Sequence, residues 1–312
     1  MIGSLIIDKP EELTSHDVVA RVRRATATRR VGHAGTLDPF ATGVLVVCVG
    51  PATRLVQFLV GLNKEYVATV RLGFTTDTQD LTGKQITPLL TSNELSINDV
   101  RRTLDDFSGP QLQVPPMYSA KKVGGERLYK AARQGREVER EPVHITIHSI
   151  ELIESDEAQV NPGDGGTRDF LMRVRCSSGT YVRTLAHDIG NKLGVGAHLA
   201  ALRRTAVGPF GIDGALTLDE VEARGKRGEI DGSLVSPSDM LGHLPLLLLD
   251  ESRMRLALHG REVRLHDEEV KTIQGRAGPV RLCDETGELF GVGEYDVAGR
   301  TVKPRIILHH KV

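Results

Sequence analysis

One carboxylate stands inside a glycine-rich stretch that could hold it close to a bound group. The stretch is Gly32–Gly43, and Asp38 lies near its middle, followed by Pro39. Glycines let the backbone fold closely around a ligand, and proline fixes the backbone beside the carboxylate. A carboxylate held rigidly against an apolar interior can act as a nucleophile or a general base. Because Asp-Pro is also a common turn dipeptide, these residues alone leave a plain turn open.

Apolar segments on both sides of this stretch must anchor it. Leu5–Asp8 and Val44–Gly50 are short apolar runs typical of strands, and the second is rich enough in β-branched residues to be buried on both faces. Between them, Thr14 and Ser15 offer capping hydroxyls to a helix whose apolar residues recur at helical spacing. The sequence therefore predicts a strand, a helix, the Asp38 stretch as a loop, and a second strand.

The rest of the chain alternates helix and strand patterns. We expect helices at 51–62, 97–107, 127–134 and 181–193, the last capped by Thr180, and a capping box at 217–220. We expect strands at 65–73, 143–152 and 170–176, with a polar hairpin tip at 154–169. Residues 236–244 resemble a linker, and the short strands after it suggest a small β-barrel.

The size and composition of the chain bound its class. Single cores rarely exceed roughly 250–300 residues, so 312 residues predict two domains, which we place at 1–240 and 246–312. Hydrophobic residues make up 39% and charged residues 26%, as in ordinary soluble proteins, and no run approaches a membrane span. The three cysteines are widely spaced, so we interpret them as reduced core thiols rather than metal ligands. Nothing near Met1 resembles an export signal.

Positive charge is concentrated in two clusters, although the net charge is only −1. Any binding to nucleic acid must therefore be local. The second cluster is interleaved with two tyrosines, a mixture that suits looped RNA, although solvated helix faces would give the same pattern. The clusters comprise Arg21, Arg23, Arg24, Arg29 and Arg30, then Lys121, Lys122, Arg127, Lys130, Arg133, Arg136 and Arg140 with Tyr118 and Tyr129.

Several motifs in order give the sequence a family resemblance. The Asp38 stretch closely resembles the signature of the TruB family of transfer-RNA pseudouridine synthases. The same family is matched by Ile7-Asp8-Lys9-Pro10, Lys64-Glu65-Tyr66, Pro115-Pro116-Met117-Tyr118-Ser119-Ala120, Ser178-Gly179-Thr180-Tyr181-Val182-Arg183-Thr184-Leu185 and Ala201-Leu202-Arg203-Arg204. The resemblance thus extends from the first strand to Arg204.

This resemblance implies both a fold and a reaction. The fold is α/β of the α+β type, with a catalytic domain built on a central mixed, largely antiparallel sheet and a small C-terminal domain of the PUA or PUA-like kind. The reaction isomerises uridine 55 in the T-loop of transfer RNA to pseudouridine, without a cofactor. A uridine stacked in a folded loop is out of reach, so the enzyme should flip it into a pocket.

The resemblance also assigns roles to particular residues. It makes Asp38 the nucleophilic carboxylate and Arg183 its partner, whose charge should lower the pKa of Asp38. Tyr66 would stack on the target base, and His33 would fill the place that the flipped base leaves. Taken without the family, Arg183 reads as a surface-helix residue, Tyr66 as a strand-packing residue and His33 as an unremarkable histidine.

Further positions match the family's pocket and its partner. Tyr181 and Leu202 match residues that close over the base, and Lys9 with Pro10 matches a pair near the pocket floor. The partner would be the T-arm of transfer RNA, whose phosphates the two basic clusters would hold. We expect a cytoplasmic monomer that needs no protein partner and no membrane.

Three other functions compete with this interpretation. A guide-RNA-dependent catalytic subunit shares the Gly-Thr-Leu-Asp-Pro core, but Pro39–Gly43 and Gly73–Asp80 resemble the stand-alone bacterial type. An RNA chaperone could use the same pocket without turnover and need not exclude catalysis. A hydrolase has little support, because no Gly-x-Ser-x-Gly elbow is present and neither His187 nor His198 has metal-ligand spacing.

Overall fold

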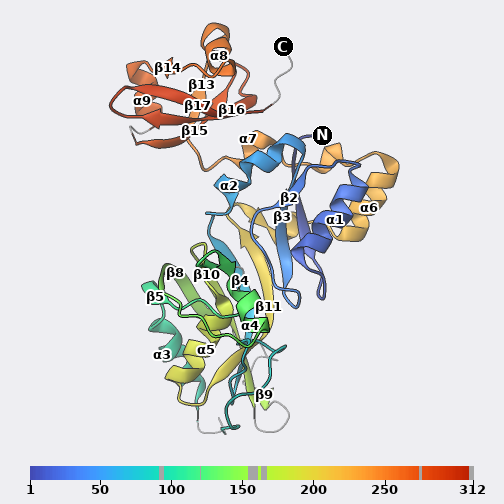
Figure 1. Cartoon of the computed structure of the whole chain (residues 1–312), viewed down its shortest axis with the longest axis vertical. Coiled ribbons are helices and arrows are strands. Elements are labelled where there is room, and N and C mark those ends of the chain that lie inside the picture. The colour runs from blue at the N-terminus through green and yellow to red at the C-terminus, as the bar shows by residue number, and fades with distance from the viewer. Residues whose placement is uncertain (91–94, 120, 154–160, 163–166, 274–275, 309–312) are drawn as a thin grey trace.

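The computed structural model describes residues 1–90, 95–119, 121–153, 161–162, 167–273 and 276–308, which form two large sheets (Figure 1) and a small two-stranded one. The larger sheet has the strand order β1-β3-β11-β4-β10-β8-β5. Neighbours along this path are antiparallel, except that β11 lies parallel to β3. The strands are β1 (Gly3–Lys9), β3 (Thr42–Val49), β4 (Lys64–Leu72), β5 (Gly109–Gln113), β8 (Val143–Leu152), β10 (Arg168–Cys176) and β11 (Ala197–Val207). The predicted mixed, largely antiparallel sheet is confirmed.

Helices cover the larger sheet in two groups. At the β1–β3 end, α1 (Ser15–Ala25) and α6 (Leu218–Arg227) pack together over a buried apolar cluster. The second group covers other strands: α3 (Ile97–Asp105) packs on β8 and α5 (Val182–Lys192) packs on the central strand β11. Because other side chains bury the second face of β3, that strand is covered on both faces, as its apolar sequence predicts.

The helix starts confirm most of the capping predictions. Thr14, Ser96 and Thr217 each cap a helix in a capping box. Thr180 does not cap α5: its hydroxyl donates to the Ser177 carbonyl, and the N-cap residue is Tyr181, whose side chain makes no cap bond. The start of α5 therefore needs a partner from elsewhere in the fold.

The chain between 236 and 249 differs from the predicted linker. It contains α7 (Pro237–Met240), where Met240 and the following Leu241 are fully buried, and then β13 (Leu246–Leu248). These side chains join an apolar cluster that also includes Val292 and Ile306 of the second sheet. The segment is an ordered connection, because its apolar residues are shared between the two sheets. The proposed boundaries at 240 and 246 stay predictions.

The second sheet has the strand order β13-β15-β16-β17-β14 and encloses its own apolar cluster. Its elements are β14 (Val263–Arg264), β15 (Gly278–Cys283), β16 (Leu289–Asp296) and β17 (Thr301–Ile307), with α8 (Glu251–Leu258) and α9 (Asp267–Thr272). It lies at one end of the molecule, next to α7 and α2 (Val56–Leu59) (Figure 1). The predicted small C-terminal β domain corresponds to this sheet.

Shorter elements complete the chain. The predicted helix at 51–62 is a 3-10 helix followed by the single turn of α2, and the predicted hairpin tip at 154–169 falls largely outside the described residues. These elements are β2 (Val31–His33), β6 (Lys122–Val123), β7 (Glu126–Arg127), α4 (Leu128–Arg133), β9 (Asn161–Pro162), β12 (Phe210–Gly211) and the 3-10 helices η1 (Gly50–Leu55), η3 (Ile212–Gly214) and η4 (Asp231–Ser233).

Two general expectations can be compared with the described residues. Cys48, Cys176 and Cys283 are free and buried, as predicted for reduced core thiols. Among the helices described, none is both long enough and apolar enough to span a bilayer.

Candidate active site

A pocket of about 960 Å³ opens beside the Asp38 loop, which we define as Gly32–Gly43. Its walls come from segments far apart in the sequence: the Asp38 loop, β4, the stretch after β4, the stretch after β5, the start of α5 and β11. Of the residues predicted for the site, five line this pocket, namely Asp38, Tyr66, Tyr181, Arg183 and Leu202. His33, Lys9 and Pro10 are not part of the lining.

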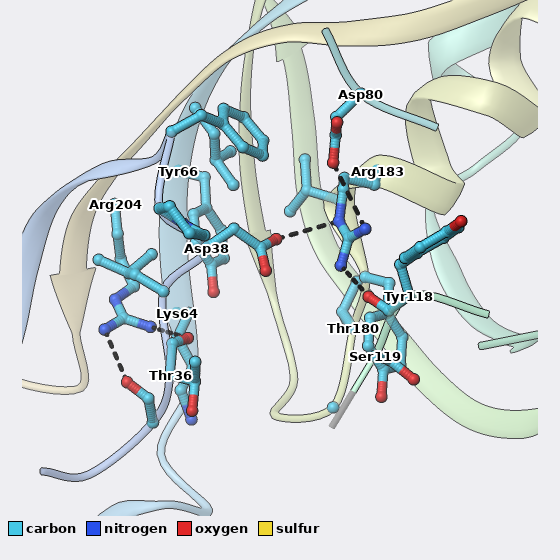
Figure 2. Close-up of a pocket in the computed structure, with 18 of the residues that line it drawn as sticks. Thr36, Asp38, Lys64, Tyr66, Asp80, Tyr118, Ser119, Thr180, Arg183 and Arg204 are labelled. Carbon is cyan, nitrogen blue, oxygen red and sulfur yellow. Dashed lines mark hydrogen bonds and ion pairs between the residues drawn. The ribbon is translucent and has the colours of Figure 1, made fainter. Parts of the chain in front are cut away.

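Arg183 connects three of these segments (Figure 2). Its Nε lies 3.0 Å from Asp38 Oδ2, and its Nη1 lies 3.4 Å from Asp80 Oδ2. Its Nη2 donates to the Tyr118 carbonyl at 2.8 Å, and Nη1 also donates to the Thr78 carbonyl at 3.1 Å. The arginine is buried, so its guanidinium has little freedom and aims one edge at Asp38.

Asp80 is a second carboxylate at the site, and it is buried. Its Oδ1 accepts hydrogen bonds from the hydroxyls of Thr78 and Thr82 and from the Thr82 amide. With its other oxygen toward Arg183, Asp80 is held in one orientation. The segment 73–80 carries part of the family resemblance, but nothing in its sequence pattern singles out Asp80 as a partner of Arg183.

The predicted effect of Arg183 on the Asp38 carboxyl is only part of the outcome. Burial raises the pKa of Asp38 above its ordinary value, Arg183 lowers it, and the Asp80 carboxylate raises it again, with a net rise. The predicted lowering of the Asp38 pKa by Arg183 is therefore confirmed. Desolvation of the carboxyl and the second carboxylate, which the sequence does not reveal, outweigh it. The Asp38 side chain keeps 37% of its exposure on the pocket side, where a substrate could reach it.

Buried side chains hold the backbone of the Asp38 loop. Lys9 Nζ donates to the Pro39 carbonyl at 3.1 Å and to two carbonyls of its own turn. The Ser15 hydroxyl bonds to both the amide and the carbonyl of Leu37. Arg204 donates to carbonyls on either side, those of Gly35, Thr36 and Val44. Lys9 thus supports the loop from beneath rather than facing the pocket, while Pro10 is exposed.

Gly43 ends the loop at a point of close approach. Its φ of +101° favours glycine, and a Cβ there would lie 2.2 Å from the Arg204 carbonyl oxygen. This contact occurs where β3 and β11 pair in parallel, with Arg204 opposite Gly43. Any side chain at position 43 would push β11 away from the loop that Arg204 holds.

The aromatic and apolar walls complete the pocket. Tyr66 is buried on β4 between Val174 and Arg204. Burial raises the pKa of its phenol, with Arg204 opposing part of the shift, so Tyr66 is a neutral donor at neutral pH. Leu202 is buried on β11, and Tyr181 is half-buried at the start of α5. These three side chains can enclose a flat ring beside Asp38.

His33 lies on β2, at the base of the Asp38 loop. Its ring packs edge-on against His16, with centroids 5.5 Å apart, and His16 lines the pocket while His33 does not. Burial lowers the pKa of His33, so its imidazole is neutral at neutral pH. The pair therefore places two rings edge to face beside the pocket.

The two basic clusters differ in how much charge they present. Arg21 is paired with Glu222 and Asp219 on α6, and Arg136 is paired with Glu126. In contrast, Arg23, Arg24, Arg29, Arg30, Lys122 and Lys130 are exposed. Tyr118 and Tyr129 line the pocket, and the side chains of Arg127 and Arg133 lie outside the described residues. Each cluster thus has exposed cations, and each also has an arginine that is paired with a carboxylate.

The arrangement suits acid–base or nucleophilic chemistry on an organic ring. Among the described residues, no group of three or more histidine, cysteine, aspartate or glutamate side chains could hold a metal ion. His198, considered for a hydrolase, is buried, and its Nδ1 donates to the Phe74 carbonyl at 3.1 Å. Asp38 and Arg183 form an ion pair in the pocket wall.

Comparisons with known proteins agree with the sequence resemblance. The model for the N-terminal domain of TruB family pseudouridylate synthases matches residues 23–182, and the model for the C-terminal domain of tRNA pseudouridylate synthase B matches 183–241. The tRNA pseudouridine synthase B of Saccharophagus degradans is 41% identical over 98% of this chain and 95% of its own. That of Opitutus terrae is 50% identical over 71% and 87%, respectively.

A solved structure shares the fold. The crystal structure of a Cbf5–Nop10–Gar1 complex contains a chain that is 27% identical, with a TM-score of 0.71 over 97% of this chain and 83% of that one. The agreement covers both sheets, so the predicted combination of a large catalytic sheet and a small C-terminal sheet is that of a known fold.

Proposed function

Because the chain belongs to the TruB family of pseudouridylate synthases, we propose that it converts uridine 55 in the T-loop of transfer RNA to pseudouridine, with Asp38 as the catalytic carboxylate. The observation that carries this proposal is the Asp38–Arg183 pair, 3.0 Å apart in the wall of an open pocket. The activity is that of an isomerase, since no atom is gained or lost overall.

The isomerisation requires little more than one correctly oriented carboxylate. The bond between ribose C1′ and uracil N1 breaks, the freed base rotates, and C5 bonds to C1′. The C5 proton leaves to solvent, and N1 takes up a proton from solvent. Asp38 could add covalently to the ring or sugar, or it could remove the C2′ proton to give a glycal-type intermediate. In either route its carboxylate must be ionised, and Arg183 favours that form.

The target base would have to leave its stack to reach Asp38. In our proposal the flipped uracil lies against Tyr66, with Leu202 and Tyr181 closing over it. His33, supported by His16, would stack in the vacated place. Lys9 would act through its support of the loop, and Pro10 is exposed outside the pocket lining.

The proposed partner is the T-arm of transfer RNA. The enzyme would act on it as a monomer in the cytoplasm, without a protein subunit. The exposed arginines and lysines would contact phosphates and fix the register of the RNA. The second sheet would serve as the PUA-like RNA-binding domain. A guide-dependent enzyme, the nearest alternative, would fail on naked transfer RNA.

The test uses a T-arm stem-loop tritiated at uridine C5, without metal, cofactor or guide. Wild type should release tritium from uridine 55, and Asp38→Asn should be slower by on the order of 10⁴-fold or more, because Asp80, the other carboxylate among the described lining residues, is held by Thr78, Thr82 and Arg183. Equal release by both proteins would remove Asp38 from the reaction. No release by either would reject the stand-alone synthase.

The same pair of proteins addresses a chaperone role. We propose that binding and refolding of transfer RNA use the pocket walls and basic clusters, which Asp38→Asn leaves in place. Filter binding and refolding of a misfolded transfer RNA should therefore survive in that variant. If both are lost together with turnover, the chaperone activity has no separate basis.

A further inference from the structure

The first turn of α5 has an unusual partner. Its N-cap residue, Tyr181, has no side-chain cap and an extended backbone, with φ −99° and ψ 103°. The side-chain amide of Gln113, at the end of β5, bonds to both backbone groups of Tyr181. The Tyr181 amide donates to Gln113 Oε1 at 2.8 Å, and Gln113 Nε2 donates to the Tyr181 carbonyl at 3.1 Å. One glutamine thus replaces the bonds that a neighbouring strand would make.

The bonds to Gln113 are added to the helix's own. The Tyr181 carbonyl also accepts from the Leu185 amide at 3.0 Å, so both of its lone pairs are used. Gln113 is 3% exposed, and a buried amide with matched partners is directional. The tie therefore fixes where α5 begins and how its first turn is rotated.

Arg183 lies in that first turn, and the chain that carries Gln113 contacts it a second time. After Gln113 the chain runs through Pro115 and Pro116 to Tyr118, whose carbonyl accepts from Arg183 Nη2 at 2.8 Å. The segment 113–118 therefore holds the backbone just before Arg183 and also the far side of its guanidinium. A small rotation of the first turn would change the 3.0 Å contact between Arg183 and Asp38.

We propose that Gln113 is a positioning residue, which sets the Asp38–Arg183 pair through the first turn of α5. This inference rests on the proposed catalytic role of Asp38. The alternative is a glutamine that only stabilises the fold. The two differ in one consequence: a positioning residue alters the proton affinity of Asp38, because Arg183 lowers the pKa of that carboxyl only while it stays close.

The experiment compares Gln113→Met with Gln111→Met. Both replace a β5 glutamine by a side chain of similar length without amide bonds. Gln111 is a matched control because its amide donates to the Phe107 carbonyl, away from the pocket. Turnover of the tritiated T-arm is measured from pH 4.5 to 8, together with thermal unfolding of each full-length variant.

For Gln113→Met we expect kcat to fall about 10-fold and KM to change by less than about threefold, since a misplaced cation costs orientation rather than binding. The acid limb of kcat/KM should move up by about half a pH unit. Gln111→Met should match wild type in kcat, in KM and in the acid limb of kcat/KM. Loss of kcat with an unmoved acid limb, or no loss in a folded variant, would overturn the proposal.

A second variant covers the case in which Gln113→Met does not fold. Gln113→Glu keeps the acceptor for the Tyr181 amide and removes the donor to its carbonyl, so kcat should be reduced and the limb shifted in the same direction. An unshifted limb would again reject the positioning role. If wild type itself releases no tritium, the proposed function fails first, which separates that failure from the failure of this inference.

Discussion

The two sides of the pocket hold buried cations in different ways. On one side, Arg183 lies between two carboxylates, those of Asp38 and Asp80. On the other, Arg204, Lys9 and Lys64 donate to backbone carbonyls, and among the described residues none of these three pairs with a carboxylate. All four cations are buried, so the contrast is in the partner and not in the exposure.

The difference in partners separates a cation that affects the reactive carboxyl from cations that support the backbone. A cation between carboxylates changes how tightly those carboxyls bind protons, so Arg183 and Asp80 together tune Asp38. A cation that bonds only to carbonyls satisfies backbone groups that would otherwise be buried without partners. We therefore expect substitutions at Arg183 to change a pH profile, and those at Arg204 to change stability.

Arg183→Ala should have the largest effect. It removes both the orientation of Asp38 and the cation that lowers its pKa, so kcat/KM should fall on the order of 10³-fold and its acid limb should move to higher pH. Folding stability should change modestly. The measurement is tritium release across pH, with Arg175→Ala, an exposed arginine on β10, as the control. Near-normal activity would remove Arg183 from the site.

Arg204→Met should mainly weaken the fold. It leaves the carbonyls of Gly35, Thr36 and Val44 without this donor, which should cost about 2–4 kcal/mol of unfolding free energy in urea. Arg204 is not among the groups that shift the pKa of Asp38, so the acid limb of whatever activity remains should stay in place. A shifted acid limb would contradict the proposed division between the two sides of the pocket.

Asp80→Asn should act in the opposite direction from Arg183→Ala on the pH profile. The Asp80 carboxylate raises the pKa of Asp38, so its neutralisation should move the acid limb of kcat/KM to lower pH. Turnover should fall about 10-fold, because Arg183 loses one of its two carboxylates. If the limb moves upward, Asp80 acts only by holding Arg183.

Lys9 should give the smallest effect, seen chiefly in stability at high pH, although its charge also lowers the pKa of Asp38. Burial lowers the pKa of its amine from 10.5 to about 8. Between these values the unfolded chain keeps a proton that the folded chain has released, so folding gains stability as pH rises. The difference in unfolding free energy between wild type and Lys9→Met should grow by about 1–3 kcal/mol from pH 8 to 10. Lys84→Met, at an exposed site, should show no such growth.

The sequence predicts local structure well where one pattern dominates. Val143–Leu152 has the predicted bounds, and the capping boxes at Thr14 and Thr217 begin the predicted helices. The central strand β11 (Ala197–Val207) was not predicted. Its alanines and paired arginines lack strand alternation, and Arg204 is buried only because loop carbonyls from distant parts of the chain meet it.

The family motifs predicted the site residues better than physical reasoning from residue type and spacing did. Asp38, Tyr66 and Arg183 stand in quoted motifs, and the structure brings them to one pocket. The roles of Asp80 and Gln113 depend on contacts with Arg183 and Tyr181 at the start of α5, which are distant in sequence and which no local pattern reveals. The lowering of the Asp38 pKa by Arg183 was predictable, but the net rise was not, because desolvation depends on the folded surroundings.

The place of β11 in the sheet has a consequence for the time at which the protein becomes active. Strand β11 separates β3, which follows the Asp38 loop, from β4, which carries Tyr66. Until Ala197–Val207 has left the ribosome, the two halves of the sheet have no common neighbour, and Arg204 cannot bind the loop carbonyls. Long-range pairing of this kind forms late. In a nascent chain, Asp38 is thus synthesised before the sheet that would position it can form.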